Sequence, residues 1–313
     1  MIDVLYIIGG LVLLILGGDW LLKAAVSLSL RLQIPKIVIG MTVVSFATSA
    51  PELIVSIKAA LDGLPDLALG NVVGSNIANL GLVLGITVIL GSIDVKKNFY
   101  TTDWPAMMVA SALFFAFIYF DGTLQRYEGG ILFICLIAFL VYLLKFQKKA
   151  VVEDEAVEDE EPVSISKTIM FLIIGGTALW AGSELLIEGA KALAQDLGVS
   201  DRIIGVTVIS IGTSIPELAA SIIAVIKKEK AISLGNLIGS NIFNILAVLG
   251  ITAMITPVNV VDEGLLSNDI FWMLGIAFAI LPLVFFPKSL RLGWREGVIL
   301  LVGYIVFVYF TIA

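Results

Sequence analysis

Histidine is absent from the 313 residues of the chain, and cysteine occurs once, at Cys135. Without histidine there is no Ser-His nucleophile pair and no histidine zinc site, and a single thiol forms neither an intramolecular disulfide nor a thiolate metal centre. Charged residues are also scarce, at 14% of the chain, against about 25% in an average soluble domain. These absences exclude most hydrolases, and we expect neither enzymatic activity nor a cofactor.

Apolar residues are abundant instead. They make up 59% of the chain and give a mean hydropathy of +1.06, whereas a soluble domain has about 45–50% apolar residues. No soluble fold of this length could bury so much apolar surface, so the composition predicts an integral membrane protein surrounded by the lipid bilayer. Much of the net charge of -7 lies in one acidic run, 153–161. The charge therefore indicates no nucleic-acid partner, and no obligatory protein partner is inferred.

Ten apolar runs are long enough to cross a membrane as helices, which takes about 20 residues each. The runs are about 4–30, 36–61, 66–91, 104–120, 127–146, 167–195, 202–226, 231–256, 268–286 and 295–312. No basic segment of a secretory signal precedes the first run, so we expect it to stay in the mature protein. The chain is therefore predicted to be an all-α integral membrane protein, with residues 1–313 forming a single transmembrane domain.

Lysine and arginine, which are enriched in the cytoplasmic loops of membrane proteins, predict the orientation. With the N-terminus outside, fourteen of the nineteen basic residues fall in the cytoplasmic connections. The asymmetry predicts both termini outside and the acidic segment inside.

Two stretches of the sequence occur twice at the same offset of 165 residues. Gly40–Ile57 matches Gly205–Ile222 at eleven of eighteen positions, and Gly70–Thr87 matches Gly235–Thr252 at twelve of eighteen. Many matches are Gly, Thr, Ser, Pro, Glu or Asn, so a shared apolar composition does not explain them. The chain is therefore predicted to contain an internal repeat.

Each copy of the repeat holds five spans, so the second copy must enter the membrane from the opposite face. We predict two inverted five-helix repeats, 1–146 and 167–313, joined by a cytoplasmic acidic linker, 147–166. Inverted repeats are typical of secondary transporters, whose substrate sites lie near the midplane on interrupted helices.

Polar residues interrupt the second and seventh spans beside a proline. The two segments are Thr48-Ser49-Ala50-Pro51-Glu52 and Thr213-Ser214-Ile215-Pro216-Glu217. A proline inside a helix frees a backbone carbonyl, and carbonyl, hydroxyl and carboxylate oxygens are the ligands of hard cations such as Ca²⁺. Glu52 lies four residues after Thr48 and three after Ser49, so the three share one helix face, and the second segment has the same spacing.

The third and eighth spans carry polar residues at every fourth position. These are Asn71, Ser75 and Asn79 in the third span and Asn236, Ser240 and Asn244 in the eighth. If the four segments meet about a two-fold axis, they surround a midplane cavity that contains oxygen ligands only. Two glutamates neutralise one Ca²⁺, or hold Na⁺ with the help of hydroxyl groups. Competition between these ions for shared ligands is the physical basis of exchange.

Each of these residues also has a structural interpretation. A charge at the membrane centre costs at least ~2.5 kcal/mol, so we favour function for both glutamates. We favour ligation for Ser75, Asn79, Ser240 and Asn244, whereas helix packing is equally compatible with Asn71, Asn76, Asn236 and Asn241. The acidic run lacks the spacing of an EF-hand and is interpreted as a solvated linker. Asp19 and Glu184 occupy equivalent positions, for which an interfacial location is favoured over an ion path.

At these motifs the sequence resembles the calcium/cation antiporter superfamily and, within it, the sodium/calcium exchanger branch. The resemblance includes Gly212–Glu217, Thr48–Glu52, Gly70–Ser75 and Gly235–Ser240. It implies Ca²⁺ extrusion driven by Na⁺ entry through alternating access, and the short linker resembles that of members in prokaryotic cytoplasmic membranes. The ligand residues that it implies are Thr48, Ser49, Glu52, Ser75, Asn79, Thr213, Ser214, Glu217, Ser240 and Asn244.

Three alternatives remain at this point. Asn244 stands where some family members carry Asp, which argues against K⁺ co-transport, but both glutamates can be protonated, so H⁺ coupling is the first alternative to Na⁺. A cation channel is the second, although one chain already holds both halves of a site. An intramembrane enzyme is the third, and it lacks a Ser-His pair or an aspartate pair.

Overall fold

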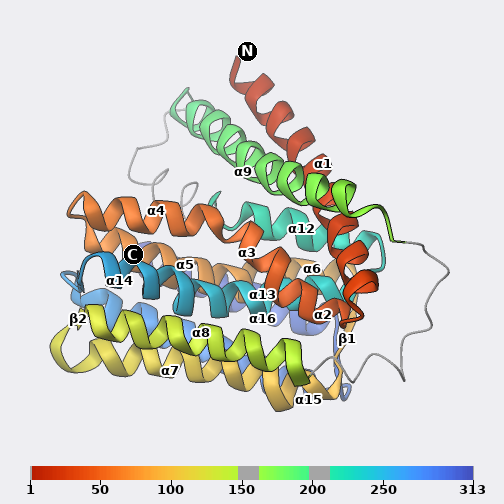
Figure 1. The fold of residues 1–313 in the computed structure, drawn as a ribbon. Helices are drawn as coiled ribbons and strands as arrows, with labels where there is room; N and C mark the ends of the chain where they lie inside the picture. The colour runs from red at the N-terminus through yellow and green to blue at the C-terminus, as the bar shows by residue number, and fades with distance from the viewer. Residues whose placement is uncertain (1, 147–161, 197–211, 313) are drawn as a thin grey trace. The chain divides into compact units, whose positions relative to one another are not determined.

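The computed structural model describes residues 2–146, 162–196 and 212–312, and almost all of them are helical (Figure 1). The α-helices are α1 (Ile2–Leu32), α2 (Lys36–Ile39), α3 (Ser45–Thr48), α4 (Ala50–Leu61), α5 (Pro65–Ala78), α6 (Leu84–Leu90), α7 (Trp104–Asp121), α8 (Arg126–Phe146), α9 (Ile165–Asp196), α12 (Ile215–Ile226), α13 (Lys230–Phe243), α14 (Gly250–Ile255), α15 (Ile270–Phe285) and α16 (Trp294–Ile312). Wider π-helical turns continue several of them: η1 (Gly40–Val44), η2 (Asn79–Val83), η3 (Phe99–Asp103), η6 (Asn244–Leu249) and η7 (Leu265–Asp269).

Eight helical stretches of the described residues are long and apolar enough to cross a membrane. A ninth is added if the broken pair Lys36–Thr48 and Ala50–Leu61 counts as one span. The prediction of an all-helical membrane protein is thereby confirmed at this level. The predicted span 202–226 lies partly outside the described residues, and its described part contains α12.

Burial separates the helices that face lipid from those inside the protein. The share of an 18-residue window that is buried is 78% in Pro65–Leu90 and 83% in Lys230–Ile255. In α16 this buried share is only 22%. Large apolar side chains such as Ile305 on α16 and Leu5 on α1 are more than half exposed. Lipid, which is as apolar as these side chains, surrounds them in the membrane.

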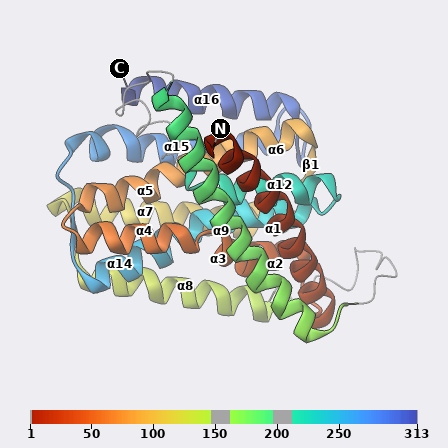
Figure 2. The same cartoon turned by 90° about the horizontal axis from the view of Figure 1, so that it is seen from above.

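The described helices form two compact units. Unit 1 consists of Met1–Thr48 and Leu144–Asn236. In it α1 and α9 lie side by side along much of their length (Figures 1 and 2). Glycines permit this approach: a Cβ atom at Gly10 would lie 2.7 Å from the Gly182 carbonyl oxygen, and one at Gly175 would lie 3.0 Å from the Gly17 carbonyl oxygen. The two contacts are related by the offset of 165 residues, because Gly10 corresponds to Gly175 and Gly17 to Gly182.

Unit 2 consists of Ser49–Leu143 and Leu237–Ala313. In it α4 packs on α5, α15 packs on α5 and α7, and α6 packs on α16. Glycines again meet in pairs: a Cβ at Gly129 of α8 would lie 2.6 Å from the Gly250 carbonyl oxygen of α14, and a Cβ at Gly297 of α16 would lie 2.6 Å from the Gly85 carbonyl oxygen of α6. Each unit thus combines helices of both predicted repeats.

Two short antiparallel strand pairs were not predicted. Strand β1 (Ile93–Asp94) pairs with β4 (Arg291–Leu292), with Ile93 opposite Leu292. Strand β2 (Thr123–Leu124) pairs with β3 (Val258–Asn259), with Leu124 opposite Val258. In unit 2 these pairs join loops that the topology prediction places on the same side of the membrane.

Candidate cation site

In both proline-containing segments a helix begins directly after the serine of the motif. Ser49 caps α4 with φ −89° and ψ 4°, and Ser214 caps α12 with φ −90° and ψ 3°. These angles lie in the sparsely populated bridge region, where many functional-site residues are found. Pro51 and Pro216 lie in the first turn of the helix that follows, where the missing N–H costs no helical hydrogen bond. The predicted interruption is confirmed in the first copy, where Lys36–Thr48 and Ala50–Leu61 are bent by 45°. In the second copy, the residues before Gly212 lie outside the described part of the chain.

The two glutamates that follow these breaks are completely buried. Glu52 and Glu217 are both 0% exposed, a position that an ionised carboxylate occupies only with compensating partners. Among the described residues, no three acidic, cysteine or histidine side chains gather in one place. A cation site in this part of the protein must therefore take most of its ligands from hydroxyl, amide and backbone oxygens.

In unit 1, four of the predicted ligands lie on neighbouring elements. Thr48 is on α3, Thr213 and Ser214 are in the turn before α12, and Glu217 is on α12. Helix α3 packs on α12. Thr48 Oγ1 donates to Asn236 Oδ1 over 3.2 Å. Ser45 Oγ lies 2.8 Å from the Gly40 carbonyl oxygen and 2.9 Å from that of Asn236. These bonds fix the end of the broken helix against α13.

Close backbone contact between two glycines makes those bonds possible. A Cβ at Gly40 would lie 2.5 Å from the Ile232 carbonyl oxygen, and a Cβ at Gly235 would lie 2.3 Å from the Ile37 carbonyl oxygen. Any larger residue would push the η1 turn away from α13. The glycines of the repeated motifs therefore position polar groups in unit 1.

In unit 2 the predicted residues lie on elements that pack on one another. Ser49 and Glu52 belong to the start of α4, Ser75 to α5, Asn79 to η2, Ser240 to α13 and Asn244 to η6. Helix α4 contacts both α5 and η6, and α5 also contacts η2 and η6. Ser75, Asn79, Ser240 and Asn244 are at most 1% exposed. Glu52 belongs to unit 2 and Glu217 to unit 1, so convergence of the two carboxylates stays a prediction.

Three of the predicted ligands have buried polar atoms without a hydrogen-bond partner among the described residues. These are Asn79, with both its amide nitrogen and its amide oxygen, Asn244 Oδ1 and Ser214 Oγ. The large majority of buried side-chain polar atoms are hydrogen-bonded, so each exception needs an explanation such as an ion or a water molecule. The oxygen atoms of these three residues are available as ligands for a cation.

The asparagines for which packing was an equal alternative make hydrogen bonds within the protein. Asn71 Nδ2 donates to Ser56 Oγ over 3.0 Å, and Asn236 Nδ2 donates to Ser221 Oγ over 3.5 Å, at equivalent positions of the repeats. Asn76 Nδ2 donates to the Asn241 carbonyl oxygen. Asn241 Nδ2 donates to a carbonyl of its own helix. The structure favours the packing interpretation for these four side chains.

Two buried hydroxyl groups outside the predicted set resemble the ligand candidates. Thr87 and Thr252 are 0% exposed, and neither Oγ1 atom has a partner among the described residues. They lie eight residues after Asn79 and Asn244. The four-residue spacing of the polar stripe continues through the apolar Val83 and Val248 to these two threonines, so extending the stripe by two steps would have found them.

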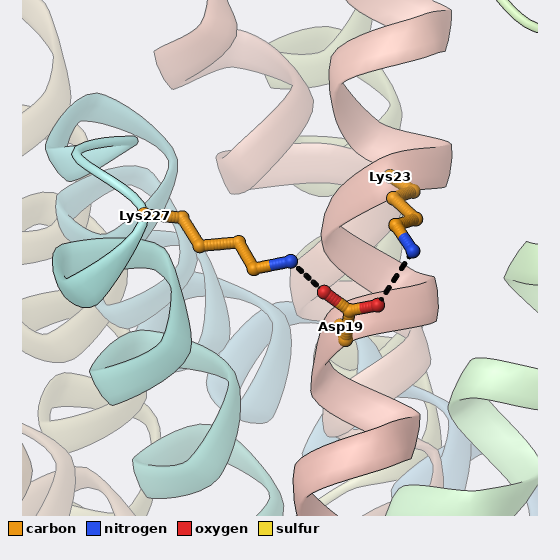
Figure 3. Close-up of polar contacts among 3 residues, drawn as sticks. All are labelled: Asp19, Lys23 and Lys227. Atoms are coloured by element: carbon orange, nitrogen blue, oxygen red, sulfur yellow. Dashed lines mark hydrogen bonds and ion pairs between the residues drawn. The ribbon is translucent and has the colours of Figure 1, made fainter.

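Asp19 lies in an ion-pair cluster of unit 1. Its carboxylate accepts from Lys23 Nζ over 2.8 Å and bonds to Lys227 Nζ of the loop after α12 (Figure 3). All three side chains are partly exposed. Glu184, at the equivalent position in α9, is exposed. Both side chains therefore reach the surface of the protein, and their interfacial location stays a prediction.

The described residues form a helical membrane protein with one broken span, two buried carboxylates and amide oxygens that have no partner in this part of the chain. These are features of a secondary cation transporter. Comparison with known proteins identifies the class more closely. The sequence model of the sodium/calcium exchanger protein family matches residues 2–145 and 167–313. The chain therefore belongs to the sodium/calcium exchanger protein family, and the predicted antiporter class is confirmed.

Several relatives match over nearly the full length. The chain is 38% identical to the putative antiporter CaxA of Alkalimonas amylolytica over 99% of this chain and 98% of the relative. It is 30% identical to the sodium/calcium exchanger MaX1 of Methanosarcina acetivorans, with 98% of this chain and 97% of the relative covered. Among solved structures, the sodium-calcium exchanger NCX_Mj superposes with a TM-score of 0.83 at 28% identity and covers 99% of this chain and 98% of that one.

Proposed function

We propose that this protein exchanges Ca²⁺ for Na⁺ by alternating access, at a site formed by oxygen atoms from both copies of the repeat. Besides the family, the observation that carries the proposal is a set of buried amide and hydroxyl oxygens, at Asn79, Asn244 and Ser214, that have no hydrogen-bond partner among the described residues. The proposed ligands are Thr48, Ser49, Glu52, Ser75, Asn79, Thr213, Ser214, Glu217, Ser240 and Asn244. The transported ions are substrates, and the proposal invokes no cofactor and no protein partner.

The chemistry of these ligands suits two ions of different charge. Ca²⁺ takes six to eight oxygen ligands, carboxylates among them, and the two glutamates balance its charge. The other side chains are neutral, so they serve Ca²⁺ and Na⁺ alike. Because both ions need the same carboxylates, binding of one displaces the other. That competition couples the two transport directions.

We further propose ten spans in two inverted five-helix repeats, with both termini outside and the protein in a prokaryotic cytoplasmic membrane. Contacts within each unit support this topology. Lys36 Nζ bonds to Glu229 Oε1 over 2.8 Å, joining two loops assigned to the inside. The Val261 N–H donates to Asp66 Oδ1 over 2.8 Å. This bond joins the loop before η7 to the first turn of α5, which are both assigned to the outside. The pairs of glycine contacts at equivalent positions support a two-fold relation between the repeats.

The transport proposal is tested with radiolabelled Ca²⁺ and proteoliposomes. An outward Na⁺ gradient is expected to drive uptake by the wild type, while Glu52→Gln and Glu217→Gln each reduce the initial rate at least about 100-fold, because each removes one of two charges that balance Ca²⁺. Glu263→Gln is the control, since the Glu263 side chain is exposed and Glu263 is not among the proposed ligands. Uptake by either buried variant at the wild-type rate would remove its carboxylate from the mechanism.

H⁺ coupling is the second candidate, because the chain is also 25% identical to the Ca(2+)/H(+) antiporter ChaA of Bacillus subtilis over 82% of this chain and 78% of the relative. The same proteoliposomes separate the two. A pH gradient without Na⁺ is expected to drive less than about one tenth of the Na⁺-driven uptake. Equal rates would favour H⁺ as the driving ion.

The topology is tested by labelling single cysteines in a Cys135→Ala background. A membrane-impermeant maleimide is expected to label Asp62→Cys in intact cells and Lys97→Cys only after permeabilisation. Both positions are exposed, so their sidedness decides the labelling. The opposite pattern would invert the proposed orientation.

A further inference from the structure

A second feature of unit 2 has no part in the proposed ion site. A cavity of ≈ 380 Å³ lies where α6 ends and α16 begins, and these two helices pack on each other (Figure 2). Its walls come from the end of α6 and from the loop between α15 and α16. The pairing of β1 with β4 holds these two loops together.

Positive charge dominates the lining of this cavity. Lys288, Arg291 and Arg295 line it together with one carboxylate, Glu296. Glu296 is 5% exposed, and its Oε2 accepts from the Gly293 N–H over 2.7 Å, so this carboxylate is engaged at the start of α16. The lining therefore has an excess of two positive charges, as expected of a site for an anion.

The three cations are only weakly compensated by other carboxylates. Arg291 donates to Ser92 Oγ over 2.6 Å. Its Nε lies 3.8 Å from Asp94 Oδ1, and the Asp94 side chain is 81% exposed, so this ion pair is largely screened by solvent. Lys288 makes no ion pair with any described residue. The cationic groups remain available to a ligand.

Exposed apolar side chains surround the same cavity. Trp294 and Leu90 line it and are 62% and 58% exposed, and Phe286, next to the lining residue Pro287, is 74% exposed. The Arg295 guanidinium lies 5.5 Å from the Trp294 ring centroid. Tryptophan beside arginine at the end of a membrane-spanning helix is typical of the level of the lipid headgroups.

We infer that this cavity binds the phosphodiester headgroup of an anionic phospholipid. The three cations contact the phosphate, and the acyl chains lie along the exposed apolar surface of α6 and α16. Basic pockets between transmembrane helices are known to bind anionic headgroups. A soluble phosphate would use the cations but not the apolar rim, so the rim favours lipid as the ligand.

Native mass spectrometry of the full chain in detergent tests this site, with phosphatidylglycerol and phosphatidylcholine of identical acyl chains as probes. The wild type is expected to bind phosphatidylglycerol at least tenfold more tightly than phosphatidylcholine. The variant Lys288→Gln/Arg291→Gln/Arg295→Gln is expected to lose at least tenfold in affinity for phosphatidylglycerol and nothing for phosphatidylcholine. Lys288 is exposed and makes no ion pair with any described residue, so Lys288→Gln is not expected to disturb folding. This single variant is expected to lose about threefold in affinity for phosphatidylglycerol, which tests the site even if the triple variant misfolds.

The control variant removes the same charge elsewhere. Lys97, Lys145 and Lys167 are exposed and lie outside the cavity, so their substitution by Gln is expected to leave binding of phosphatidylglycerol unchanged. An equal loss in this control would overturn the inference in favour of diffuse surface charge. Displacement of the lipid by millimolar inorganic phosphate would overturn it in favour of a phosphate ion. Because transport is not measured, neither result depends on the proposed exchange activity.

Discussion

The contact between α8 and α14 predicts opposite effects for substitutions at two adjacent glycines. Gly129→Ala would place a Cβ 2.6 Å from the Gly250 carbonyl oxygen and 2.9 Å from the Ala253 Cβ. Ordinary contacts between carbon atoms are about 3.5–4.0 Å, so the helices must separate by roughly 1 Å. Such overpacking costs about 1–3 kcal/mol. We expect Gly129→Ala to lower the free energy of unfolding by that amount.

Gly130→Ala is the matched variant on the same helix. No described atom lies within 4 Å of a Cβ at this position. Glu128 of α8 and Glu296 of α16 both cap the start of their helix. Gly130 lies two residues after Glu128, and the residue two positions after Glu296 is Val298. Val298 is larger than glycine and is 42% exposed. Alanine costs less chain entropy than glycine in a helix, so we expect this variant to gain about 0.5–1 kcal/mol.

Thermal unfolding in detergent, followed by tryptophan fluorescence, measures both variants. One kcal/mol corresponds to about 2 °C for a large domain, so Gly129→Ala should unfold about 2–6 °C below the wild type and Gly130→Ala about 1–2 °C above it. Gly129→Ala should also slow Ca²⁺ uptake, because α14 continues from the η6 turn that begins at Asn244. Equal unfolding temperatures for the two variants would refute the close contact between α8 and α14.

Other substitutions separate ligand residues from structural ones. Ser214 Oγ is buried and has no hydrogen-bond partner among the described residues. Without Na⁺ and Ca²⁺, Ser214→Ala is therefore expected to raise the free energy of unfolding by about 1 kcal/mol, yet to weaken Ca²⁺ uptake. Ser45→Ala removes two hydrogen-bond contacts and should lower the free energy of unfolding by about 1 kcal/mol in the same assay. If Ser214→Ala and Ser45→Ala changed the free energy of unfolding in the same direction, the distinction between a ligand serine and a structural serine would be contradicted. A double-mutant cycle with Asp19→Asn and Lys227→Gln should give a coupling below about 1 kcal/mol, because the Lys227 side chain is 45% exposed. A larger coupling would mean that the pair is desolvated.

Hydropathy alone located the helices that face lipid. The predicted spans 4–30, 127–146, 167–195 and 295–312 agree with α1, α8, α9 and α16 to within two residues at each end. These helices are continuous apolar runs with polar flanks, so composition determines their limits. The break between α3 and α4 was also predictable, because Pro51 follows a Thr-Ser pair in a repeated motif.

Other features depend on contacts that a hydropathy profile does not contain. The helical turn η3, which leads into α7, begins at Phe99, five residues before the predicted start. This turn is polar, so hydropathy does not show that its Asp103 is 0% exposed. The strand pairs and the two units arise from packing between residues far apart in the sequence. The repeated motifs pointed to Ser75, Asn79, Ser240 and Asn244, which are all at most 1% exposed. Sequence alone could not distinguish the hydrogen-bonded Asn71 from Asn79, whose amide group has no partner among the described residues.

The π-helical turns that begin at Asn79 and Asn244 have a geometric consequence for the polar residues beyond them. A side chain every fourth residue drifts by roughly 40° per step around an α-helix, so a polar stripe with that spacing would wind away from any fixed face. A π turn holds more residues per revolution and offsets part of this drift, which brings Thr87 and Thr252 back toward the line of the asparagines. Deleting one residue within either turn would therefore rotate the rest of the helix by roughly 100°. Such a deletion would leave the hydropathy profile almost unchanged while turning a buried hydroxyl toward a different neighbour.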